Sequence, residues 1–410
     1  TQNFTTATDS HNVAVGYESG TAITTGVNNT LLGGITGDAL TTGSENVAVG
    51  RSALGADTLG SHNVGVGFQA LASQNFTTAT DAYNVAVGYN SGVSVTTGVQ
   101  NVIIGGLAGD ALTDADYNVA IGTGALSSDT LGSRSIAIGQ GALGDQNFTT
   151  ATDSYNVAVG YTAGLSVTTG TINTIVGGQA ADAMTTGTSN VAFGFAALGA
   201  EVAGHRNVAV GTYALFNQSN SGSTNAYNTA VGYGAGNDVT TGTLNTFVGG
   251  LSGDAFTTGQ ENTGLGYQAL TADTKGKFSV AVGNNALATQ NFTTATSAFN
   301  TAVGYDAGLT LTTSIQNTLI GGLAGDALTT SAGLNVAVGY AALSSDTLGA
   351  NSVAVGRAAL ANQNFTTATD TYNTAVGYSA GASVTTAIQT VLVGGLAGDA
   401  ITDGHLNTAL

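Results

Sequence analysis

The stretch that decides the fold reads NTAVGYGAGNDVTTGTL over residues 228–244, and Asn245 then starts the next unit. Each unit opens with Asn, a β-branched residue, a small or apolar residue, an aliphatic residue and Gly. Repetition at a short fixed period is typical of solenoids, in which every repeat forms one coil stacked on the last. The sequence therefore predicts an all-β fold, a parallel β-solenoid of 17-residue coils.

A longer period contains the short one. Three 17-residue steps and one 21-residue step make a 72-residue super-repeat, and Asn335 is preceded by a single extra residue. Super-repeats start near residues 12, 84, 156, 228, 300 and 373. We expect residues 1–410 to form one continuous array. Both ends fall inside a unit and carry no capping sequence, so we expect an internal part of a longer fibre.

Composition excludes several classes of function. The chain has 62 Gly, no Pro, no Cys and a net charge of −18. Its six Lys and Arg residues are scattered, which argues against a nucleic-acid surface. No stretch approaches the ~18 consecutive apolar residues of a membrane span. Apolar residues are too frequent for disorder, at 42%.

Each position of the unit predicts a place in the coil. Stacked Asn residues at the first position are expected to form a hydrogen-bonded ladder along the fibre. The second and fourth positions alternate with period two, and we expect both to face the interior. The fifth position is Gly in every complete unit, from Gly16 to Gly394, which indicates a turn with positive φ or close backbone approach. A second Gly, as at Gly26, marks another corner.

The third position is then expected to face outward. It is small in most coils but bulky in the second coil of each super-repeat, at Leu31, Ile103, Ile175, Phe247, Leu319 and Leu392. Isolated exposed apolar residues are common, but a position that recurs in register favours packing against another chain. We therefore expect an oligomer.

The four extra residues of each fourth coil fall within the segment QNFTTATD. We expect this segment to bulge from one edge of the solenoid without breaking the stack. Residues 216–227 depart from the pattern. The other bulges contain a phenylalanine at Phe4, Phe76, Phe148, Phe292 and Phe365.

The units resemble the repeats of bacterial and bacteriophage tail-fibre-like proteins, as in Asn228–Tyr233 and Asn373–Tyr378, both NTAVGY. The segment SIAIG at residues 135–139 is similar to the head repeats of trimeric autotransporter adhesins. The resemblance covers the whole chain and implies a homotrimeric extracellular fibre on a virion or a bacterial surface. The 17-residue coil and the 72-residue super-repeat depart from the adhesin pattern, so handedness and chain arrangement stay open.

No residue pattern predicts an enzyme. His11, His62, His205 and His405 sit at irregular positions, mostly in turns, without ligand spacing. We predict no catalytic, cofactor-binding or metal-binding residue and no cofactor. The expected partners are further copies of the chain, and a glycan or receptor on a host surface could contact the repeated bulges.

Two alternatives stay open. GGxxGD recurs at residues 33–38, 105–110, 249–254, 321–326 and 394–399, and superficially resembles calcium-binding β-rolls. One Asp in four coils cannot fill a calcium site alone, and an Asp that bonds turn amides is the simpler interpretation. Thr-Thr pairs such as Thr24-Thr25 suggest ice binding, but Asp57-Thr58 and its equivalents interrupt the array. Asn-Phe-Thr sequons, as at Asn75, matter only in a eukaryotic secretory route.

Overall fold

The computed structural model describes residues 2–330 and 333–410, which form two compact units. Unit 1 runs to His205 and includes residues 221–223; unit 2 comprises residues 206–220 and 224–410. Each unit is a parallel β-solenoid with coils of the predicted length, and the described ranges contain no helix. The extra residue before Asn335 adjoins residues 331–332, which lie outside these ranges.

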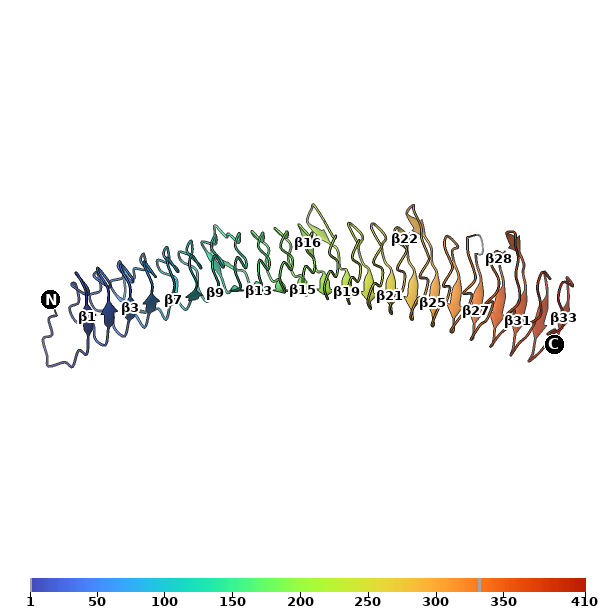
Figure 1. The fold of residues 1–410 in the computed structure, drawn as a ribbon, viewed down its shortest axis with the longest axis horizontal. Helices are drawn as coiled ribbons and strands as arrows, with labels where there is room; N and C mark the ends of the chain where they lie inside the picture. The colour runs from blue at the N-terminus through green and yellow to red at the C-terminus, as the bar shows by residue number, and fades with distance from the viewer. Residues whose placement is uncertain (1, 331–332) are drawn as a thin grey trace. The chain divides into compact units, whose positions relative to one another are not determined.

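Each coil of unit 1 contributes one short strand to a parallel sheet, and Figure 1 shows these strands as a row of arrows with the longer loops opposite. The sheet strands are β1 (Val13–Val15), β2 (Thr30–Leu32), β3 (Val47–Val49), β5 (Val64–Val66), β7 (Val85–Val87), β8 (Val102–Ile104), β9 (Val119–Ile121), β11 (Ile136–Ile138), β13 (Val157–Val159), β14 (Thr174–Val176) and β15 (Val191–Phe193). Two-residue strands near the bulges are β4 (Gly60–Ser61), β6 (Thr80–Asp81), β10 (Gly132–Ser133), β12 (Thr152–Asp153) and β16 (Gly204–His205).

Unit 2 is built in the same way. Its sheet strands are β17 (Val208–Val210), β19 (Thr229–Val231), β20 (Thr246–Val248), β21 (Thr263–Leu265), β23 (Val280–Val282), β25 (Thr301–Val303), β26 (Thr318–Ile320), β27 (Val336–Val338), β29 (Val353–Val355), β31 (Thr374–Val376), β32 (Val391–Val393) and β33 (Thr408–Ala409). Its two-residue strands are β18 (Thr224–Asn225), β22 (Gly276–Lys277), β24 (Thr296–Ser297), β28 (Gly349–Ala350) and β30 (Thr369–Asp370).

Equivalent positions of successive coils lie directly beside one another. Ala86 of β7 pairs with Ile103 of β8, and Ile103 pairs in turn with Ala120 of β9. The pairing continues across a bulge, because Val64 of β5 pairs with Val85 of β7 although the longer step of the super-repeat separates them. The prediction that bulges leave the stack intact is confirmed.

The predicted direction of the strand side chains is wrong. Except in the end coils, the third position is buried, and Leu31, Ile103, Ile175, Phe247, Leu319 and Leu392 are each 0% exposed. The second and fourth positions instead face outward, as the exposed Leu32 and Ile104 show. The bulky third-position residues are therefore core residues and form no outward contact surface.

The asparagine ladder explains this orientation. Asn29 donates from Nδ2 to the carbonyl of Gly43 in its own coil and to Oδ1 of Asn12 in the preceding coil. Its own Oδ1 accepts the main-chain amide of Asn46 in the next coil. An amide that spans the coil in this way has to point inward, and the third position lies on the same side of the strand. The ladder prediction is confirmed.

Small and large side chains complement one another inside the coil. Leu31 reaches across to the opposite wall, where a Cβ on Gly20 would lie 2.8 Å and one on Gly37 2.9 Å from its methyl carbons. In the third coil the small and large side chains exchange places. The strand carries Ala48, and the opposite wall carries the buried Leu54. The bulky residue of the second coil thus fills space that glycine leaves empty.

Two backbone positions make the turns around each strand. The fifth-position glycine has φ near +140°, as in Gly232 (138°), and its missing Cβ leaves room for the carbonyl of the next coil. The predicted glycine turn is confirmed. The residue before each Asn is also left-handed, although none is glycine; Tyr83 has φ of 52°. In coils that do not follow a bulge, the amide of this residue donates to a carbonyl of the preceding coil, as Asn28 does to Ser10.

Candidate functional site

The outward side of the sheet is the most distinctive surface of each unit. We define the outer ribbon as the side chains at the second and fourth strand positions. The second position is Val, Ile or Thr, and the fourth is Val, Ile, Leu or Phe in every coil. Val87, Ile104, Phe193 and Ile320 are among its exposed members. The coil spacing of ~4.8 Å makes this a continuous apolar strip.

Columns of exposed aromatic residues flank the outer ribbon. The pre-asparagine column, which is the residue before each Asn, includes Tyr83 at 50% and Tyr155 at 53% exposure. The post-glycine column, which is the residue after each turn glycine, includes Tyr89 at 57%. Ring contacts link neighbouring coils, since Phe68 and Tyr89 stack with centroids 5.5 Å apart and Arg134 lies 4.9 Å from the Tyr117 centroid.

A buried polar cluster of the same three residue types recurs in the interior of four super-repeats. Asp129 of the third coil accepts a hydrogen bond from Nε2 of Gln146 at 2.6 Å. Oε1 of Gln146 accepts one from Nδ2 of Asn156 at 2.9 Å. All three side chains are 0% exposed. We call this arrangement the acid–amide cluster; its equivalents join Asp57 to Gln74 and Asn84, Asp273 to Gln290 and Asn300, and Asp346 to Gln363 and Asn373.

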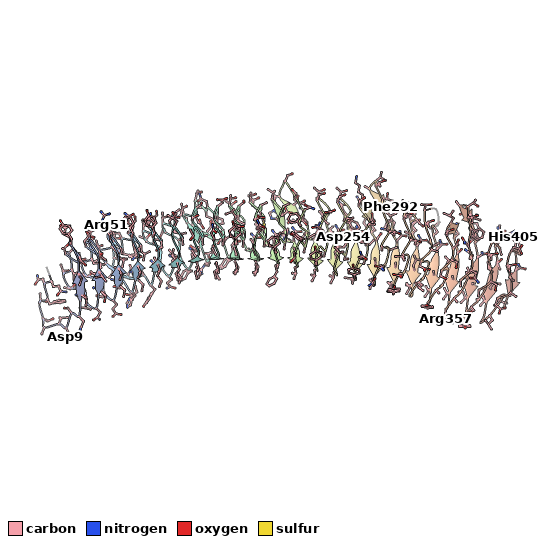
Figure 2. The ribbon with its side chains drawn as sticks, in the orientation of Figure 1. Asp9, Arg51, Asp254, Phe292, Arg357 and His405 are labelled. Atoms are coloured by element: carbon pink, nitrogen blue, oxygen red, sulfur yellow. The ribbon has the colours of Figure 1, made fainter. Side chains whose placement is uncertain are left out.

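The acid of this cluster holds the bulge in place. Oδ1 of Asp129 accepts the main-chain amides of Gly132 at 3.1 Å and Phe148 at 3.0 Å. Phe148 belongs to the bulge of the fourth coil and is buried. Phe292 occupies the equivalent place at the end of its coil remote from the strand arrows (Figure 2). In the sequence these aspartates interrupt a threonine array, and no local pattern predicts their burial.

Burial has an electrostatic cost at these acids. Desolvation raises the pKa of the Asp57, Asp273 and Asp346 carboxyls above the ordinary value. Hydrogen bonds from the paired glutamine and from main-chain amides oppose part of that rise in pKa. The acids therefore serve as buried hydrogen-bond acceptors. No substrate-sized cavity adjoins them among the cavities found in the described residues.

The acidic turns of the GGxxGD segments do not come together as a metal site. Desolvation raises the pKa of the Asp110 carboxyl, and a hydrogen bond from its own main-chain amide opposes part of that rise in pKa. The carboxyl of Asp254 accepts a hydrogen bond from the Thr271 hydroxyl. Within residues 2–330 and 333–410, no group of three or more His, Cys, Asp or Glu side chains is placed to hold an ion.

The histidines also lie apart from one another. His62 lies between the carboxylates of Glu45 at 3.2 Å and Asp81 at 3.1 Å, and its ring stacks on Tyr83 with centroids 4.8 Å apart. His205 accepts the amide of Thr188 at Nδ1. The contacts of His62 span three coils, and sequence spacing within one coil gave no sign of them.

The threonine pairs are partly used inside the stack. The first Thr of the pair donates its hydroxyl to the next coil, as Thr24 does to the carbonyl of Thr41 at 3.2 Å. The second Thr, such as Thr25, is exposed. On the bulges, the sequon residue Asn75 is exposed and accepts the Thr58 hydroxyl at 2.9 Å.

No protein-family model, no curated protein and no solved structure matches this chain. The described residues contain no helix of the length and apolar character that crossing a membrane requires.

Proposed function

We propose that this chain is a structural segment of an extracellular fibre, a phage tail fibre or a bacterial surface adhesin, that assembles as a homotrimer through its outer ribbon. The observation that supports this most is the unbroken apolar fourth position on the outward side of the sheet. Solvent-facing sheet positions are polar in most antiparallel sheets, so an apolar column needs a partner surface.

The size of the ribbon supports such an interface. Eleven strands of unit 1, three residues wide, cover a flat strip of roughly 500 Å² at ordinary strand dimensions. That projected area already matches the largest apolar patch of a typical monomer, about 300–600 Å². The side chains on the strip add accessible area, toward the ~800 Å² per partner of a stable interface.

The interior of the coils suits a mechanical role. Main-chain hydrogen bonds run from coil to coil at the strand and at the turns, as from Val85 to Asn101 and from Leu107 to Tyr89. The Asn ladder adds a second row of bonds in the core. A fibre of this kind resists bending and shear, and it holds a binding region away from the surface that carries it.

Light scattering on the intact chain tests the assembly. We expect a mass of about 120 kDa, three times the 40.0 kDa of one chain. Val87→Lys, Val248→Lys and Val376→Lys together place charges on the ribbon, and we expect the mass to fall to that of the monomer. The matched control is Thr78→Lys, Thr150→Lys and Thr294→Lys on the exposed bulges. A monomeric wild-type chain would refute the proposed assembly.

Ice binding is a second candidate function. The surface that favours it is the outer ribbon and not the Thr-Thr corners. Seven of the twelve sheet strands described in unit 2 present Thr at the second position: Thr229, Thr246, Thr263, Thr301, Thr318, Thr374 and Thr408. These lie in one column of the outer ribbon, which Val280, Val336, Val353 and Val391 interrupt. The fourth position is never Thr, which favours protein packing. Thermal hysteresis in the wild-type chain, lost in the ribbon variant, would support ice binding.

A further inference from the structure

The post-glycine column of unit 2 carries a tyrosine on every second coil. Its members are Tyr233, Tyr267, Tyr305, Tyr340 and Tyr378, with exposures of 61%, 51%, 59%, 54% and 54%. In unit 1 the same column has Arg51 and Thr123 at two of the equivalent places, so its aromatic period is broken. We call the five residues of unit 2 the tyrosine row.

The backbone beneath the tyrosine row is fixed at the coil spacing. The carbonyls of Tyr233, Tyr305 and Tyr378 accept main-chain amides from the next coil at 2.9, 2.9 and 2.8 Å. Glycine and arginine positions between them continue the ladder, as Gly250 does with Gln268. Successive tyrosines are therefore two coils, or about 10 Å, apart along the stack.

Glycines let the rings lie along the row. A Cβ on Gly250 would lie 3.5 Å from a ring carbon of Tyr267, and one on Gly322 would lie 3.5 Å from a ring carbon of Tyr340. Arg357 lies beside the strand arrows of unit 2 (Figure 2), with its guanidinium 6.0 Å from the Tyr340 centroid and 5.6 Å from that of Tyr378. The row is a supported platform and not a set of free side chains.

Hydrogen-bonding groups adjoin the platform at its first tyrosine. A cavity of about 100 Å³ is lined by Tyr213, Tyr233, Asn237 and Asp254 together with Gly234 and Leu251. Oδ1 of Asn237 is buried and accepts no hydrogen bond from the part of the chain that the structure describes. The cavity is large enough for a hydroxymethyl or acetamido group beside the Tyr233 ring, because one water occupies ≈ 30 Å³ in the liquid.

We propose that the tyrosine row binds an extended, uncharged polysaccharide of the cellulose or chitin type. Sugar rings with equatorial substituents present flat C–H faces that stack on aromatic rings, and an extended chain of this type repeats its disaccharide over a distance close to two coils. The net charge of −18 disfavours anionic glycans. This inference extends the surface-binding part of the proposed function and is independent of the self-assembly.

Cosedimentation of the intact chain with microcrystalline cellulose and with chitin tests the proposal. Amylose, whose chain is helical, is the glycan control. We expect binding to cellulose or chitin, and a loss of about a hundredfold in the partition constant when all five tyrosines are replaced by Ala, since several stacked rings each contribute. Circular dichroism and light scattering on the same samples report the fold and the assembly, so a failure of either is seen separately.

Two further variants sharpen the test. Tyr267→Asn with Asn284→Tyr keeps five tyrosines but breaks their period, and we expect it to lose most of the binding. Tyr83→Asn, Tyr155→Asn, Tyr227→Asn, Phe299→Asn and Tyr372→Asn remove five exposed rings from the pre-asparagine column, where Asn351 shows that Asn is accommodated. We expect this variant to bind normally. Absence of wild-type binding, or equal loss in both five-residue variants, would overturn the proposal.

Discussion

The first and third coils of a super-repeat provide different hydrogen-bond acceptors for the main-chain amide at the same corner. In the first coil Val95 fills the interior, and the corner amide of Gly98 donates to the carbonyl of Thr113 in the next coil. In the third coil Asp129 occupies the equivalent place, and the corner amide of Gly132 donates to its carboxylate. The next coil after Asp129 carries the bulge, so the usual carbonyl is displaced. A buried acid thus replaces a main-chain acceptor wherever the chain gains residues.

Moving the acid to the wrong coil is the change with the largest expected effect. Val95→Asp places a carboxylate of similar volume where Gly98 already has its acceptor and no glutamine faces it. An unpaired buried charge costs on the order of 5 kcal/mol, so we expect local unfolding around residues 84–118. Hydrogen exchange of peptides from that region measures it. Unchanged protection there would contradict the view that only the bulged corner accepts an acid.

Removing the acid from its proper place should cost less. Asp129→Leu leaves the amides of Gly132, Phe148 and Gln146 without their acceptor, and we expect a loss of about 3 kcal/mol. The measurement is the urea midpoint, together with proteolysis of the 147–153 bulge. Asp145→Leu, on the exposed part of the same turn, is the control. A bulge that stays protected without Asp129 would show that Phe148 alone anchors it.

Acid should stabilise the solenoid. Because burial raises the native pKa of Asp57, Asp273 and Asp346, the folded chain binds protons that the unfolded chain has released. Stability therefore rises as pH falls through the raised native pKa, and the gain is complete below the ordinary Asp value of about 3.9. Urea midpoints between pH 8 and about 4 measure it. Asp→Asn at the three positions should reduce this slope, and an unchanged slope would assign the effect to other acidic groups.

Exchanging the two polar partners should have the smallest effect. Asp129→Asn with Gln146→Glu keeps one carboxylate, one amide and an acceptor for the corner amides, so we expect a change under about 1 kcal/mol. Either single substitution should cost more than the pair in the same urea measurement. Additive costs would show that the partners act independently.

The repeat predicted the solenoid, the glycine turns and the ladder. Each of these features depends on one residue type that recurs at the same position of successive coils. The direction of the strand was missed because aliphatic residues at the second and fourth positions look like a core by hydrophobicity alone. The signal lay in Asn29 and its equivalents, whose amides need interior partners. The left-handed residues before each Asn and the contacts of His62 arise between coils, and no local sequence pattern marks them.

The corner acid also constrains how such a chain changes length. Asp129 is useful only when Gln146 and a bulge follow in the next coil, so the third and fourth coils are inherited as a pair. Recombination that duplicates or deletes one whole super-repeat preserves every pairing, whereas loss of a fourth coil leaves an acid facing a coil without an insertion, and loss of a third coil leaves a bulge without its acid. Homologues of different length are therefore expected to gain or lose the third and fourth coils together, and the whole super-repeat is a natural module for lengthening the solenoid by gene fusion.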